Sequence, residues 1–193
     1  MHSNSPMKKL TLTICLTLAV LLGSLGCSGG ADFDKGLAAA KSGDFATALR
    51  DWRPLAEDVH AKSQYNLGVL YDNGDGVPQD YKTALQWYTL AAEQGDASAQ
   101  HSLGSMYRYG EGVLQDYKTA LKWYTLAAEQ GDASAQHSLG SMYLKGDGVP
   151  RDYKTAMKCD TRAAEQGDAN AQHNLGLMYR RGQGVPQDYK TAV

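Results

Sequence analysis

Three histidines recur in this sequence at a spacing of 36 residues, and histidine is a common metal ligand. They are His101, His137 and His173. Side chains that share one zinc ion must each reach within about 2.1 Å of it, whereas stacked equivalent helices lie roughly 8–10 Å apart. No Cys, Asp or Glu recurs beside each histidine to complete a ligand set. The spacing therefore favours copies of a repeat over a metal site, and we expect no cofactor.

Other patterns resemble ion-binding or catalytic sites, and each has a simpler explanation. Residues 72–76 look like a calcium loop but lack the alternating oxygen ligands and the distal Glu of an EF-hand. Ser102 and Ser138 each follow a histidine, but adjacent helical residues point about 100° apart, so neither pair forms a Ser–His dyad. Trp87 and Trp123 could stack a ligand, although packing in the core is the expected role. We therefore expect no enzyme activity.

A repeat of 36 residues supplies the elements that would position these side chains. Residues 81–84, Tyr-Lys-Thr-Ala, recur from Tyr117, Tyr153 and Tyr189, and residues 45–80 are a more divergent copy. Apolar side chains at helical spacing predict two helices per repeat, and from residue 80 onward an Asp that can cap the helix precedes each one. One such hairpin cannot bury both apolar stripes, so neighbouring repeats must stack into an all-α superhelical solenoid. The expected helices lie at 33–41, as a half-repeat, and near 44–57, 61–72, 80–94, 97–109, 116–130, 133–145, 152–166 and 169–181.

Two positions within the repeats carry specific energetic expectations. Gly104 lies inside a helix, where glycine costs roughly 1 kcal/mol, and a close approach between helices is the expected compensation. The third copy replaces the Trp-Tyr-x-Leu of the earlier copies by Cys159, Asp160 and Arg162. Losing an aromatic side chain from a core typically costs about 3–5 kcal/mol. We therefore expect residues 153–193 to fray, to self-associate or to be completed by a partner.

The repeat resembles the Sel-one-like repeat, a variant of the tetratricopeptide fold, over about residues 45–193. That resemblance implies a right-handed superhelix and an adaptor that binds a protein or a peptide, and bacterial members are often exported. The residues that carry it are Ala97, Ala99, Gln100, Leu103, Gly104, Met106, Tyr107, Gly110, Gly112 and Val113, followed by Asp116, Ala120, Trp123, Tyr124, Ala127 and Ala128.

The first 27 residues have the pattern of a secretory signal peptide, in which Lys8 and Lys9 precede an apolar run over 10–22. Gly26-Cys27 resembles the end of a bacterial lipobox, which predicts lipidation of Cys27 and an outer-membrane-anchored, periplasmic lipoprotein of a Gram-negative bacterium. Ordinary cleavage near residues 23–28 is the alternative. The expected organisation is a signal peptide at 1–27, a linker and half-repeat at 28–44, and a solenoid at 45–193 that is truncated in its last repeat.

Charge and cysteine content exclude some partners and some means of stabilisation. Removal of the signal peptide leaves 17 basic and 21 acidic residues, so there is no basic field of the kind that binds nucleic acid. The solenoid contains one cysteine, Cys159, so packing rather than a disulfide framework must hold the fold.

In tetratricopeptide solenoids, the first helix of each repeat lines a concave groove. Subtracting the core stripe from those helices leaves a mixed polar, aromatic and basic surface that fits a peptide or an acidic protein segment. The alternative is that these are simply exposed, variable helix positions. A cell-wall-associated regulatory or hydrolytic protein acting on peptidoglycan is the alternative function. The predicted groove residues are Tyr65, His101, Ser105, Arg108, Tyr109, His137, Ser141, Lys145, His173, Arg180 and Arg181.

Overall fold

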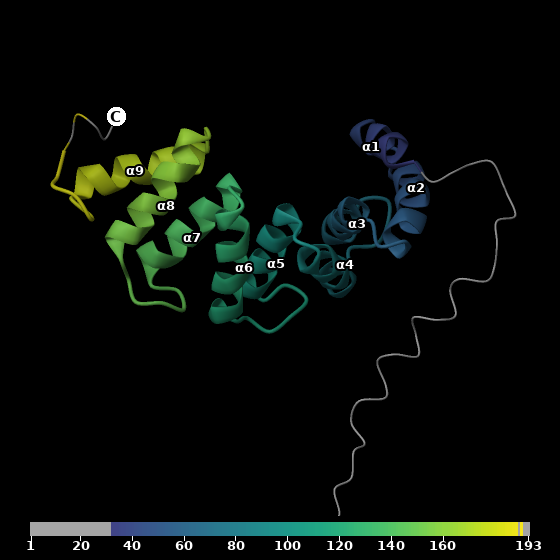
Figure 1. Ribbon diagram of the computed structural model, residues 1–193, viewed down its shortest axis with the longest axis horizontal. Coiled ribbons are helices and arrows are strands. Elements are labelled where there is room, and N and C mark those ends of the chain that lie inside the picture. The colour runs from purple at the N-terminus through teal and green to yellow at the C-terminus, as the bar shows by residue number, and fades with distance from the viewer. Residues whose placement is uncertain (1–31, 189, 191–193) are drawn as a thin grey trace, which may run out of the picture. The chain divides into compact units, whose positions relative to one another are not determined.

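The computed structural model describes residues 32–188 and 190 of the chain, and these residues fold as a stack of α-helices (Figure 1). The signal segment and Cys27 lie outside the described residues. No helix among the described residues combines the length and the apolar character needed to cross a bilayer. The helices are α1 (Phe33–Lys41), α2 (Phe45–Glu57), α3 (Ala61–Asn73), α4 (Tyr81–Glu93), α5 (Ala97–Tyr109), α6 (Tyr117–Glu129), α7 (Ala133–Lys145), α8 (Tyr153–Glu165) and α9 (Ala169–Arg181).

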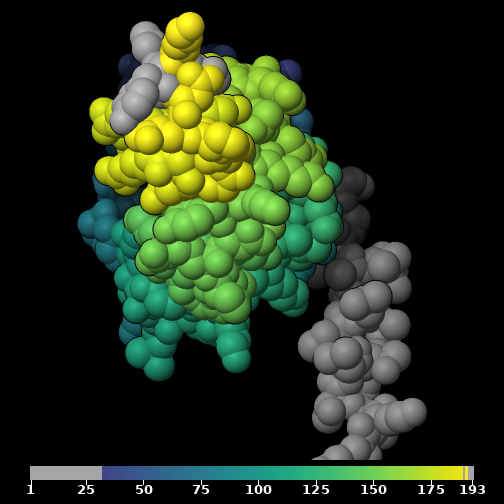
Figure 2. Space-filling model, turned by 90° about the vertical axis from the view of Figure 1, so that its left-hand side faces the viewer, coloured from purple at the N-terminus to yellow at the C-terminus, as the bar shows by residue number. Residues whose placement is uncertain are grey.

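Each helix packs against the helix before it and the helix after it, which makes the structure a solenoid. The helices α3 and α4 form one hairpin of the repeat, α5 and α6 the next, and α7 and α8 the third. The helix ends lie within one residue of the predicted ends. The sequence contains both the residues that cap each helix and the residues that terminate it. Figure 2 shows the C-terminal end of the stack, with α9 in yellow and α8 in light green facing the viewer.

Aspartates cap helices α4 to α9 as predicted, whereas His60 caps α3. Before the first helix of a repeat, the side chains of Asp96 and Asp132 accept hydrogen bonds from the third backbone N–H of the helix, at 2.8 and 2.7 Å. Before the second helix, Asp80 accepts from the N–H of Lys82 at 3.0 Å and from the hydroxyl of Thr83 at 2.7 Å. Each such cap stabilises its helix, because it satisfies an N–H group that has no partner in the helix.

The glycine inside each first helix is the point where the two helices of a repeat touch. A Cβ atom built on Gly104 would lie 2.7 Å from a ring carbon of Tyr124, and one on Gly68 would lie 2.5 Å from the ring of Tyr88. Both tyrosines are almost completely buried. The predicted close approach at Gly104 is therefore confirmed, and the tyrosine ring is the group that requires it.

A chain of buried glutamines links successive helices. The side-chain nitrogen of Gln100 donates to the carbonyl of Ala92 in the preceding helix at 3.1 Å. Its side-chain oxygen accepts from Gln130 at the end of the following helix, at 2.8 Å. Gln64 and Gln136 repeat this pattern. Because these amides are buried, the bonds fix the register of each helix against both of its neighbours.

The loop between α2 and α3 departs from the repeat at Val59. The later repeats place a glycine at this point, and Gly95 has a φ of +91°. Val59 adopts the same left-handed conformation, with a φ of +67°. A β-branched residue is an outlier there, and the conformation costs a non-glycine residue roughly 1–2 kcal/mol. Its side chain is 62% exposed, so little packing offsets that strain.

Candidate binding surface

The residues predicted to line the groove fall into three groups by exposure. The half-buried group is Tyr65, His101, Ser105, His137 and Ser141, and the exposed group is Tyr109, Lys145, His173, Arg180 and Arg181. Arg108 is buried, with 5% of its surface exposed. Subtracting the core stripe therefore identifies the outer face of a helix only where no neighbouring repeat covers it.

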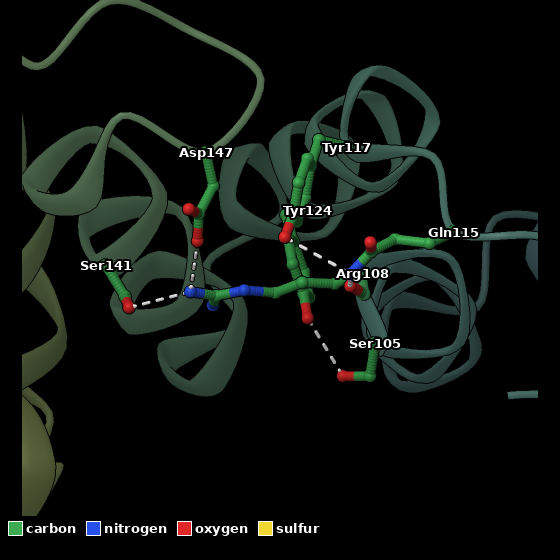
Figure 3. Close-up of polar contacts among 7 residues, drawn as sticks. All are labelled: Ser105, Arg108, Gln115, Tyr117, Tyr124, Ser141 and Asp147. Carbon is green, nitrogen blue, oxygen red and sulfur yellow. Dashed lines mark hydrogen bonds and ion pairs between the residues drawn. The ribbon is translucent and has the colours of Figure 1, made fainter. Parts of the chain in front are cut away.

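The prediction that Arg108 is an exposed groove residue is wrong. Its side chain leaves α5 and crosses to the next repeat (Figure 3). There Nη2 donates to Ser141 Oγ and to Asp147 Oδ2, both at 3.0 Å. The backbone carbonyl of Arg108 also accepts from the side chain of Gln115 at 2.7 Å. Its ionic partner lies 39 residues further along the chain, so the pattern within α5 could not reveal it.

The positions equivalent to Arg108 and Asp147 one repeat earlier carry a different pattern of charges. Asp72 stands at the position of Arg108, and Glu111 stands at the position of Asp147. Asp72 accepts a hydrogen bond from the hydroxyl of Tyr88 at 3.1 Å, and burial raises the pKa of Asp72. Burial and the nearby charge of Asp72 together raise the pKa of Glu111. The charges of two acids therefore interact at this position, whereas the next repeat holds an ion pair there.

The recurring histidines lie in three different environments. His101 Nε2 is 3.2 Å from Ser138 Oγ in the following repeat, and its ring lies 5.5 Å from that of Tyr124. Burial lowers the pKa of His101. Adjacent residues of one helix cannot form a Ser–His pair, but the stacking of the repeats brings His101 to a serine 37 residues away. His173 is exposed on the last described helix.

His137 packs against a buried carboxylate instead of a tyrosine. Asp160 occupies the position of Tyr88 and Tyr124 and is completely buried. His137 Nδ1 is 2.9 Å from Asp160 Oδ1, and the Asn174 side-chain nitrogen donates to Asp160 Oδ2 at 3.4 Å. The hydrogen bond to Asp160 raises the pKa of His137. A polar pair thus replaces the aromatic contact that the third copy has lost, while the fraying of 153–193 stays a prediction.

The last residue of each first helix is exposed in all four repeats, and we call these residues the helix-end row: Asn73, Tyr109, Lys145 and Arg181. The row changes from polar to aromatic to basic along the stack. Arg180 is exposed beside its basic end. Among the described residues no ion pair engages Lys145, Arg180 or Arg181, in contrast to Arg108.

The described residues offer no ready metal site. Within 32–188 and 190, no three His, Cys, Asp or Glu side chains lie close enough together to hold a metal ion. The tryptophans proposed as alternative stacking groups, Trp87 and Trp123, are half-buried, and each packs against the apolar cluster of the two preceding helices.

These features define an α-helical repeat solenoid with a regularly spaced row of exposed side chains. The model of the Sel1 repeat family matches residues 61–96, 97–132, 133–168 and 169–193, and the chain belongs to this family. Sel1 repeat proteins are scaffolds that generally bind other proteins and are typically non-catalytic.

Solved structures and a curated protein share this similarity. A Sel1 repeat protein from Oxalobacter formigenes has a TM-score of 0.75 at 37% identity, covering 83% of this chain and 66% of that one. A protective antigen present in uropathogenic Escherichia coli strains has a TM-score of 0.76 at 37% identity. The match covers 83% of this chain and 35% of the antigen chain. The alginate biosynthesis protein AlgK of Pseudomonas syringae pathovar tomato is 37% identical over 70 residues, which are 36% of this chain and 15% of that protein. The chain thus spans less than two thirds of the length of each of these relatives.

Proposed function

We propose that this protein is an exported scaffold that binds an acidic polypeptide along the helix-end row and Arg180. The observation that carries the proposal is the basic end of the row, where Lys145 and Arg181 are exposed on successive first helices. Arg108, by contrast, is neutralised by Asp147 at 3.0 Å. Unpaired basic groups on a surface attract acidic chains, and the exposed ring of Tyr109 adds an aromatic contact next to them.

Charge reversal at the basic end of the row tests this proposal. The double variant Lys145→Glu/Arg181→Glu is expected to lose at least about tenfold in the amount of acidic polypeptide retained from a cell-envelope extract, because it reverses two of the attracting charges. Retained polypeptides are identified and quantified by mass spectrometry at low and at high salt. Retention by the unchanged protein is expected to fall with salt, since exposed charges are screened.

A matched control comes from the second helices. Lys122 and Lys158 are exposed at equivalent positions of α6 and α8. Lys122→Glu/Lys158→Glu changes the net charge by the same amount on another surface, so this variant is expected to retain the polypeptides. An equal loss in both double variants would mean that net charge matters and the row does not.

Export and anchoring are the second part of the proposal and rest on residues 1–27. Cys27→Ser is expected to abolish membrane association, because the thiol that accepts the lipid is replaced. Detergent-phase partitioning of the protein from whole cells measures this, with Cys159→Ser as the control that keeps Cys27. Equal partitioning of the Cys27→Ser variant and the unchanged protein would contradict the lipid anchor.

A further inference from the structure

A hollow of about 360 Å³ lies between the loop that follows α2 and the C-terminal end of α4. Its apolar lining includes Val59, Trp87 and Leu90. In the described part of the chain, four large apolar side chains are exposed, and two of them, Val59 at 62% and Leu90 at 45%, line this hollow. Exposed apolar side chains that gather around a concavity are typical of an interaction site. We call it the Val59 hollow.

Val59 is the feature that distinguishes this junction from the later ones. The later repeats have Gly95, Gly131 and Gly167 at its position, each with a positive φ. Those residues show that the loop is built without strain when glycine is present. Here a β-branched residue is held in the left-handed region and its side chain projects beside Leu90 and Trp87. Glycine would avoid the strain of this conformation, so a valine here points to a role for the exposed side chain itself.

The other apolar residues of the lining are kept in the next copy of the repeat and lost in the third. At the next junction the equivalents of Val59, Trp87 and Leu90 are Gly95, Trp123 and Leu126. At the third they are Gly131, Cys159 and Arg162, which include a charged side chain. The combination of Val, Trp and Leu at these three positions therefore occurs once among the three sets compared. The equivalent positions in the later repeats can serve as controls.

Two acids stand at the edge of the hollow. Glu57 and Glu93 are both exposed and both line it, one at the end of α2 and the other at the end of α4. An apolar occupant would bring its flanking residues against these carboxylates. Basic flanking residues would be attracted and acidic ones repelled, so charge complementarity selects the occupant.

We propose that the Val59 hollow binds a polypeptide segment in which one large apolar side chain is flanked by lysine or arginine. The apolar side chain enters between Val59, Trp87 and Leu90, and the basic side chains pair with Glu57 and Glu93. This surface lies on α2, α3 and α4, apart from the basic end of the helix-end row on α7 and α9. It also selects the opposite charge, so either proposal can fail without the other.

The probe is a set of five-residue peptides with blocked ends. Each has two lysines on both sides of one central residue, which is Leu, Ile, Met, Phe or Trp. The protein labelled with ¹⁵N is titrated with each peptide, and amide and indole signals are followed by NMR. For at least one peptide, shifts are expected at Val59, Leu90 and the Trp87 indole, with small or no shifts at Gly95, Leu126 and the Trp123 indole.

Substitutions then separate binding from folding. Val59→Gly is expected to weaken peptide affinity roughly fivefold, because it removes a contact of one apolar side chain. The same substitution is expected to raise the urea midpoint of unfolding, because it removes the backbone strain. Glu57→Lys/Glu93→Lys is expected to weaken affinity at least about tenfold, while Glu129→Lys/Glu165→Lys at the later junctions leaves it unchanged.

Three results would overturn the proposal. In the first, none of the five peptides shifts the signals of Val59, Trp87 and Leu90. In the second, peptides with glutamates in place of the lysines bind as tightly as the basic set. In the third, Val59→Gly raises the urea midpoint without weakening affinity, which would show that Val59 is strained but does not take part in binding.

Discussion

Replacement of His137 by alanine is expected to lower the free energy of unfolding by about 3 kcal/mol. The reason is that the completely buried carboxylate of Asp160 would lose its 2.9 Å partner and keep only the longer contact from Asn174. Breaking one side of a buried pair costs more than the pair contributes, because the remaining charge stays out of water. Urea unfolding followed by circular dichroism measures the change.

The repeats provide both the control and the rescue for this variant. His173→Ala removes the equivalent but exposed histidine and is expected to change stability by less than about 0.5 kcal/mol. The double variant His137→Ala/Asp160→Tyr restores the tyrosine found at Tyr88 and Tyr124, so it is expected to recover most of the loss. If the double variant is no more stable than His137→Ala, Asp160 does not occupy an aromatic site that a tyrosine can refill.

The same pair makes stability depend on pH in a defined direction. The hydrogen bond to Asp160 raises the pKa of His137 in the folded state. The folded protein therefore holds this proton more tightly than the unfolded chain, in which histidine has a pKa of about 6.5. The resulting stabilisation is fully present below about pH 6.5 and is lost as the pH rises through the folded pKa. The protein is expected to lose more stability between pH 6 and pH 8.5 than His137→Ala/Asp160→Tyr does.

Reversal of Arg108 is the other substitution with a large expected effect. Arg108→Glu would place an acid against Asp147 in a site where the arginine side chain is 6% exposed and the aspartate 24%. We expect a loss of about 3 kcal/mol in the free energy of unfolding, at the low end for a buried pair because Asp147 keeps some solvent contact. Thermal and urea unfolding measure it.

The exchanged pair tests whether the charges account for this loss. Arg108→Glu/Asp147→Arg keeps one charge of each sign at the junction and is expected to recover at least about half of the stability lost. Arg180→Glu, at the equivalent but exposed position of α9, is expected to have little effect. A destabilisation as large at Arg180 as at Arg108 would contradict the buried ion pair.

The sequence predicts the helices well because each helix carries its own signals. Asp96 and Asp132 mark where helices begin, and Gly104 marks where two helices are in close contact. The contacts of the candidate surface follow a different rule. Arg108 meets Asp147, and His101 meets Ser138, at offsets of 39 and 37 residues. These offsets are one repeat plus one to three residues, so they depend on how consecutive repeats stack.

A signal for these contacts nevertheless exists in the sequence. An acid recurs at Asp75, Glu111 and Asp147, and comparing that position with the residue 39 positions earlier pairs Arg108 with Asp147. A comparison of residues 23 positions apart likewise pairs His101 with Tyr124 and His137 with Asp160. Patterns within one helix cannot show either relation, because an intervening turn and a neighbouring repeat decide which side chains are covered.

The chain of buried glutamines has a consequence for how such a protein can change length during evolution. Gln100 and Gln136 each bond to a carbonyl 8 residues earlier and to a glutamine 30 residues later. Each of these hydrogen bonds therefore joins residues less than one repeat apart, and duplication of a repeat also duplicates the bond. Duplication or deletion of 36 residues leaves no buried amide without its partners, wherever the breakpoint falls. Residues 97–107 and 133–143 are identical in sequence, as a recent duplication of this kind would leave them. Arg108, Asp160 and Val59 are local departures from the repeat, and they distinguish copies that are otherwise alike.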